Sequence, residues 1–144
     1  MGFREDLAAA KEHVADRVKT PVVPAVINGK LYNVVFYRAD SPVWSAATMN
    51  HPPRDGIALD FRNGYNLTAV TRTISASAGR IVEDGEEIQL TAEEWADFWE
   101  IAPPQTARLI EANVWHVHEY DAEQEIERAK KASSPRRASR KKST

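Results

Sequence analysis

The sequence predicts an α+β fold: one predominantly helical domain with one β-hairpin and a disordered basic C-terminal tail. Three observations lead to this prediction. Asn28-Gly29 separates two apolar, β-rich segments, apolar residues recur at helical spacing along most of the remaining chain, and the last residues contain almost nothing apolar. With 144 residues, the chain is long enough for one core and too short for two ordinary domains.

The N-terminal segment predicts an amphipathic helix, because apolar residues follow one side of it and charged residues the other. Thr20-Pro21 is expected to end this helix, since a residue that precedes proline disfavours the helical region. The apolar positions are Phe3, Leu7, Ala10, Val14 and Val18.

A β-hairpin is expected next. Asn28-Gly29 tolerates positive φ at both turn positions, and a two-residue loop pairs Ile27 with Lys30. Pro24 has no N–H for a sheet, so the first strand should lie at an edge. The pairing gathers an apolar face that should be buried: Val23, Ala25, Ile27, Tyr32, Val34 and Phe36.

Start and stop signals predict four further helices. Ser41 is expected to cap the first of these helices, and Pro42 suits the first helical position. The segment 51–54 that follows should be extended, because it contains two prolines. Asn66 caps the second, which ends near Gly79, and Thr91-Ala92-Glu93-Glu94 is a capping box for the third. The fourth helix begins at Pro103-Pro104, and its polar continuation from Asp121 to Arg128 should extend into solvent. Two turns are expected, at Asn63-Gly64 and at Glu83-Asp84-Gly85-Glu86. The expected buried positions are Leu67, Val70, Ile74 and Ala78, then Trp95, Phe98, Trp99 and Ala102, then Ala107, Ile110, Val114 and Val117.

Charge divides the chain into two parts. All 21 acidic residues lie at or before Glu127, whereas 7 of the 19 basic residues lie at or after Lys130. The segment 132–144 has too little apolar material to offset the entropy of ordering, so it should be a disordered tail after a domain at 1–131. A basic tail can bind nucleic acid by releasing counterions, but this one has no aromatic residue to stack on bases.

Several function classes find no support in the sequence. There is no cysteine, so disulfides, thiolate zinc sites and thiol nucleophiles are excluded. No signal-peptide pattern and no membrane-spanning apolar stretch is present, which places the protein in the cytoplasm. No glycine-rich phosphate loop, nucleophile elbow or H-E-x-x-H motif occurs, so no catalytic residue and no cofactor is expected.

The histidines do not form a metal-binding pattern. His116 and His118 would point to different faces of a helix, although on a strand they could share a metal. His13 falls on the polar side of the first helix, and His51 precedes two prolines. We expect no metal site. Trp44 and Trp115 are the two tryptophans not assigned to the core. Trp115 stands beside the apolar stripe of its helix and is the better candidate of the two for partner contact.

The central part of the chain resembles a known family. The resemblance begins at Tyr37-Arg38-Ala39-Asp40-Ser41-Pro42-Val43-Trp44 and continues through His51-Pro52-Pro53-Arg54, Gly64-Tyr65-Asn66 and the helix start Leu90–Trp95. It spans about residues 20–132 and ends in a charged helix and a Lys/Arg/Ser tail. On this order of motifs, the chain is similar to the tail assembly chaperones of long-tailed siphophages, particularly those that infect actinobacteria.

The resemblance implies a non-enzymatic assembly factor in the host cytoplasm. Such a chaperone coats the tape measure protein, keeps it soluble and recruits tail tube protein. It also implies homo-oligomers, and a longer form of the protein made by programmed frameshifting near Ala129-Lys130-Lys131. The expected partner-binding residues are His51, Pro52, Pro53, Arg54, Tyr65 and Trp115.

Two other classes of function stay open. One is a head–tail connector or other structural subunit of the virion. The other is a small nucleic-acid-associated protein whose tail supplies the contacts. An enzyme would require, in addition, a concave pocket with titrating groups of perturbed pKa. The basic residues of the tail that would contact nucleic acid are Arg136, Arg137, Arg140, Lys141 and Lys142.

Overall fold

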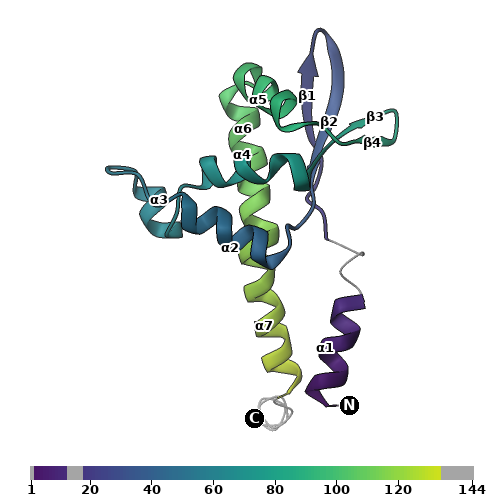
Figure 1. Ribbon diagram of the computed structural model, residues 1–144, viewed down its shortest axis with the longest axis vertical. Coiled ribbons are helices and arrows are strands. Elements are labelled where there is room, and N and C mark those ends of the chain that lie inside the picture. Colours follow the sequence, from purple (N-terminus) through teal and green to yellow (C-terminus); the bar gives the residue numbers. More distant parts are fainter. Residues whose placement is uncertain (1, 13–17, 134–144) are drawn as a thin grey trace, which may run out of the picture.

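The computed structural model describes residues 2–12 and 18–133 (Figure 1). The α+β, mostly helical fold class is confirmed. In chain order the elements are α1 (Phe3–Glu12), β1 (Val23–Ile27), β2 (Lys30–Phe36), α2 (Ser41–Asn50), α3 (Ala58–Asn63), α4 (Leu67–Ala78), β3 (Gly79–Glu83), β4 (Glu86–Ile88), α5 (Ala92–Ile101), α6 (Pro104–Trp115), the π-helical turn η2 (His116–Tyr120) and α7 (Asp121–Ala132).

Within the described residues, four strands form one antiparallel sheet in the order β1-β2-β3-β4. The predicted hairpin is confirmed, with Ile27 opposite Lys30 and with β1, which carries Pro24, at the edge. Its apolar face is buried at Val23, Ala25, Val34 and Phe36 and half-buried at Ile27 and Tyr32.

The sheet is larger than the one hairpin that the sequence predicted. The segment around Asp84-Gly85 is a turn, as expected, but it also joins β3 to β4 in a second hairpin. Asp84 and Gly85 both have positive φ, at 51° and 81°, which suits a two-residue hairpin loop. The strands were missed because β4 is short and its side chains are exposed, so no alternating pattern marks it.

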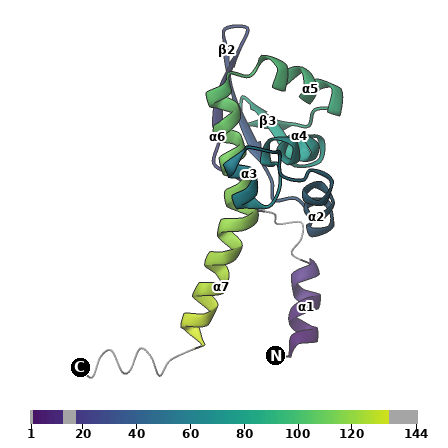
Figure 2. The same ribbon diagram turned by 90° about the vertical axis from the view of Figure 1, so that its left-hand side faces the viewer.

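Helices α4 and α6 pack against the sheet, and α2 and α5 pack against α4. Figure 2 shows α4 and α5 on one side of the long helix that α6 begins. The largest fully buried side chains include Trp95, Phe36, Ile74, Ile110, Val34, Val70 and Val114. One core therefore joins sheet and helices.

The local start signals are confirmed for α4 and α5. The Asn66 side chain accepts a hydrogen bond from the Ala69 N–H, and Thr91 and Glu94 form the reciprocal capping box. The expected inner positions of α4 are all buried. In α5 and α6 the aromatic and branched inner residues are buried as well, whereas Ala102 and Ala107 are half-buried.

Three expectations require correction. The N-cap of α2 is Asp40, and Ser41 is its first helical residue. The N-terminal helix does not reach Thr20: α1 is described only to Glu12, and Lys19 instead pairs with Tyr37 in an isolated β-bridge. Helix α3 was not predicted at all. His13, Val14 and the basic tail residues 134–144 lie outside the described residues.

Gly79 occupies the most crowded glycine position among the described residues. Helix α4 passes directly into β3 there, and a Cβ atom at Gly79 would lie 2.6 Å from the Trp95 ring and 2.8 Å from the Ser75 carbonyl oxygen. The φ of Gly79 is −83°, so the need for glycine comes from close packing and not from a left-handed backbone.

We predict that Gly79→Ala lowers the free energy of unfolding by about 3 kcal/mol, because neither the backbone of α4 nor the buried indole can move freely. The comparison is Gly29→Ala, where φ is +77° and nothing lies within 4 Å of the added atom. That change should cost about 1 kcal/mol through the left-handed backbone alone. Urea denaturation of both variants checks the order; an equal loss would contradict it.

Candidate partner-binding groove

An apolar groove of about 400 Å³ lies between α3, the start of α4 and α6. We call it the α3–α6 groove. Its apolar lining comes from Leu59, Leu67, Ala112 and Trp115. Charged side chains stand around it: the three arginines Arg54, Arg62 and Arg108 outnumber the carboxylates Asp60 and Glu111. This combination suits an apolar partner surface with acidic edges.

The turn after α3 shapes one wall of the groove. Gly64 adopts φ 86° and ends α3, and the N–H groups of Gly64 and Tyr65 both donate to the Asp60 carbonyl oxygen. Asn66 then donates its N–H to the His51 carbonyl oxygen and caps α4 with its side chain. The chain therefore changes direction within a few residues, and α3 is held beside the start of α4.

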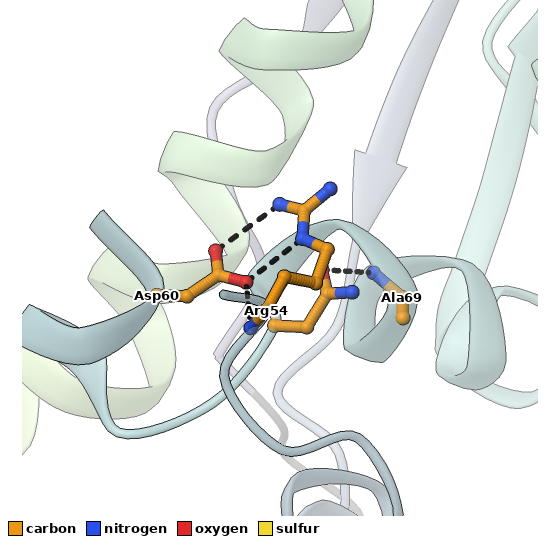
Figure 3. A network of polar contacts seen from close by, with 4 residues as sticks. Arg54, Asp60 and Ala69 are labelled. Atoms are coloured by element: carbon orange, nitrogen blue, oxygen red, sulfur yellow. Dashed lines mark hydrogen bonds and ion pairs between the residues drawn. The ribbon is translucent and has the colours of Figure 1, made fainter. Parts of the chain in front are cut away.

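Two residues of the groove lining, Arg54 and Asp60, form an ion pair (Figure 3). The Asp60 side chain is 2% exposed, and its Oδ2 accepts from the Arg54 backbone N–H at 3.0 Å and from Arg54 Nε at 2.8 Å. Its Oδ1 accepts from Arg54 Nη2 at 3.1 Å. The side-chain hydrogen bonds from Arg54 lower the pKa of Asp60 and so hold this buried carboxylate ionised.

Three exposed apolar residues lie on or next to α3, and one of them, Leu59, lines the groove. Ile57, Leu59 and Phe61 are 40%, 50% and 60% exposed. Trp115 is half-buried and packs against the core, with its ring centroid 6.2 Å from that of Tyr120. Leu59 therefore gives the groove an apolar side chain that a partner can reach.

The structure brings together two of the six residues that the sequence singled out for partner contact, Arg54 and Trp115. Pro52 is exposed and Pro53 half-buried on the segment that leads to Arg54. His51 is half-buried, and its Nε2 lies 2.8 Å from the Thr73 hydroxyl. Tyr65 is buried and donates to Glu119 at 3.3 Å, and burial raises its pKa.

The sequence did not indicate three residues of the groove lining: Leu59, Arg62 and Arg108. Leu59 and Arg62 belong to the unpredicted helix α3, whose only local signal is Gly64 at its end. Arg108 lines the groove from α6, where its Nε donates to the Pro104 carbonyl oxygen at 3.3 Å. The nucleic-acid candidates Arg136, Arg137, Arg140, Lys141 and Lys142 lie outside the described part of the chain.

A second polar cluster surrounds η2. The Ala39 N–H donates to His118 Nε2 at 2.8 Å, and His118 Nδ1 lies 2.7 Å from the Val114 carbonyl oxygen. Nε2 must accept, so Nδ1 carries the proton and the ring is neutral. Trp44 stacks on this ring at 3.8 Å between centroids. Burial lowers the pKa of His118.

In the described ranges 2–12 and 18–133, no three His, Asp or Glu side chains lie close enough together to hold a metal ion. Of the helices described there, none has the length and apolar character needed to cross a membrane. Comparison of the chain with protein-family models, with curated proteins and with solved structures finds no match. The case for a function therefore depends on the surface of the molecule and on the resemblance of its motifs.

We predict that Arg54→Ala lowers the free energy of unfolding near pH 7, because it leaves the buried Asp60 carboxylate with only the backbone N–H of residue 54 as a donor. The folded-state pKa of Asp60 is lowered, so this contribution is present above the ordinary pKa of about 3.9 and is lost as the pH falls through the folded value. Denaturation from pH 7 to pH 3 should show the two proteins converging. The control Arg62→Ala, in the same groove, should change stability little, and a pH-independent deficit would contradict the prediction.

His118 should make the fold sensitive to mild acid. Its folded pKa lies below the ordinary value of 6.5, so the unfolded chain binds a proton first and stability falls as the pH drops below 6.5 toward the folded pKa. His118→Gln keeps an acceptor for the Ala39 N–H without titrating there. The difference in unfolding free energy between the two proteins should therefore shrink from pH 7 to pH 5. A constant difference would show that His118 titrates normally.

Proposed function

We propose that this protein is a non-enzymatic tail assembly chaperone that binds the tape measure protein of a long-tailed phage in the host cytoplasm. The observation that carries the proposal is the α3–α6 groove, whose apolar lining includes the exposed Leu59 and whose charged lining residues include three arginines. A groove of this kind can bind an amphipathic helix. The apolar stripe of the helix would lie in the groove, and carboxylates beside the stripe would pair with the arginines.

A tape measure protein is a fitting occupant. Its long helices expose apolar stripes before the tail is built, and a bound chaperone would cover them. The motif order from Tyr37 to Trp95 supports the same assignment through its resemblance to the family. The acidic character of the chain up to Glu127 would keep such a complex soluble.

Helix α1 offers a further contact for the same kind of partner. It has no buried residue, and Phe3 and Leu7 are 77% and 50% exposed. In Figures 1 and 2 it stands apart from the sheet and its covering helices. Several modest contacts, in place of one tight interface, suit a chaperone that must later be displaced by tail tube protein.

We predict that co-expression raises the soluble yield of the tape measure protein from the same phage, and that Leu59→Glu abolishes this gain by placing a charge in the groove. Leu59 is 50% exposed, so the variant should fold. The matched control is Met49→Glu on α2, which is 81% exposed and does not line the groove. No gain with the unaltered protein would overturn the proposal, and equal loss in both variants would place the binding surface elsewhere.

A further inference from the structure

A second apolar groove lies at the other end of α4, between the β1–β2 hairpin, the β3–β4 hairpin and α5. We call it the hairpin groove. It has a volume of about 440 Å³, and its apolar lining includes Ile27, Tyr32, Ile88, Leu90, Phe98 and Ile101. Ile101 and Ile88 are 63% and 39% exposed, so the side chains of a bound partner can reach the lining.

The strands that line the hairpin groove present the same face that the domain covers with helices elsewhere. Helices α4 and α6 pack against the sheet. In the observed register, the strand residues of the groove share a face with Val34 of the core; they are Ile27, Tyr32 and Ile88. Nearer the two hairpin turns this face is less covered, since Ile27 and Tyr32 are half-buried and Ile88 is exposed. A further helix would therefore continue the helical layer and bury its own apolar stripe there.

Among the described residues, the charged lining of the hairpin groove is acidic. Glu83, Glu94 and Asp97 line it, and no lysine or arginine does. Glu94 also accepts a hydrogen bond from the Thr91 N–H in the capping box. Asp97 is exposed and makes no hydrogen bond or ion pair within the part of the chain that the structure describes. The groove thus carries negative charge that a basic partner can neutralise.

Lys30 shows how a cation is held at one edge of this groove. Its Nζ lies 3.2 Å from Glu83 Oε1 and 5.3 Å from the centroid of the Tyr32 ring. A carboxylate and the face of an aromatic ring therefore attract the same ammonium group. On the opposite side of the groove, Glu94 and Asp97 of α5 offer carboxylates without a cation from this chain among the lining residues.

We infer that the hairpin groove binds an amphipathic helix of another protein, whose apolar stripe contacts Ile101 and whose flanking lysines or arginines pair with Asp97 and Glu94. The two described helices of this chain that bury no residue, α1 and α7, carry more acidic than basic side chains, so neither has this charge pattern. The inference concerns a surface separate from the α3–α6 groove and does not rest on the proposed function.

The test uses two synthetic helical peptides with the same leucine stripe, one flanked by lysines and the other by glutamates. The labelled lysine peptide, titrated with the full chain and followed by fluorescence anisotropy, should bind, less tightly at high salt. Ile101→Glu should weaken this binding about tenfold or more, because a charge then stands in the apolar lining. Ile101 is 63% exposed, so the variant should fold.

Leu109→Glu is the matched control. Leu109 is 49% exposed on α6 and does not line the hairpin groove, so this variant should bind the lysine peptide as the unaltered protein does. Both variants add one negative charge. Association driven by charge alone would therefore be stronger in both, and only docking in the groove predicts a loss in one.

A second pair of variants tests the acidic lining. Asp97→Lys should weaken binding of the lysine peptide and strengthen binding of the glutamate peptide. Glu100→Lys makes the same change of charge at an exposed position of α5 outside the groove, and it should alter both affinities little.

Equal affinity of Ile101→Glu and Leu109→Glu for the lysine peptide would overturn the inference, as would the absence of binding at millimolar concentration. Loss of the lysine peptide in Leu59→Glu, with Ile101→Glu unaffected, would place the peptide in the α3–α6 groove and overturn it too. None of these results depends on the soluble yield of a tape measure protein, so this inference and the proposed function can fail separately.

Discussion

The junction at Gly79 is the constraint on which the rest of the fold depends. Helix α4 passes into β3 without a loop, so the last turn of the helix, the sheet and α5 all meet at one residue. Trp95 and Phe36 pack with ring centroids 5.6 Å apart beside it, and Trp99 reaches across to donate to the Ser75 hydroxyl at 3.1 Å. A residue without a side chain lets the indole of Trp95 approach the backbone, and that contact fixes the sheet relative to α4 and α5.

The two grooves follow from this arrangement. The α3–α6 groove lies at the N-terminal end of α4. A second apolar groove, between the two hairpins and α5, lies beyond its C-terminal end, next to β3. Helix α4 packs against both α6 and the sheet, so the two grooves share one core. Basic residues predominate around the first groove and acidic residues around the second, so the sign of the surface charge differs between the two ends of α4. Partners of opposite charge pattern can then be selected at the two ends.

The features that the sequence predicted are those that neighbouring residues determine. Asn28-Gly29 sets its hairpin, Asn66 caps α4, and the Thr91 capping box begins α5, all through contacts within three or four residues. Helix α3 has only the glycine at its end as a local signal, and β4 is short and exposed, so neither was predicted. The turn η2 was missed because it depends on a contact from the distant Arg38. The grooves could not be predicted because they are made by residues far apart in the sequence: Arg54 and Trp115 were selected separately, and only the fold brings both to the lining of the α3–α6 groove.

The turn η2 shows how a distant contact can override a helical pattern. In an α-helix the Asp121 N–H would donate to the Val117 carbonyl oxygen, but here it donates to His116, five residues earlier. The Val117 oxygen instead accepts from Arg38 Nε at 2.8 Å, and Arg38 also reaches Glu125 on α7 at 3.6 Å. Trp44 adds a hydrogen bond to Glu119 from α2. The widened turn thus fastens the long helix to the domain just where its buried stripe ends, and α7 can project from a rigid base with its own apolar face uncovered.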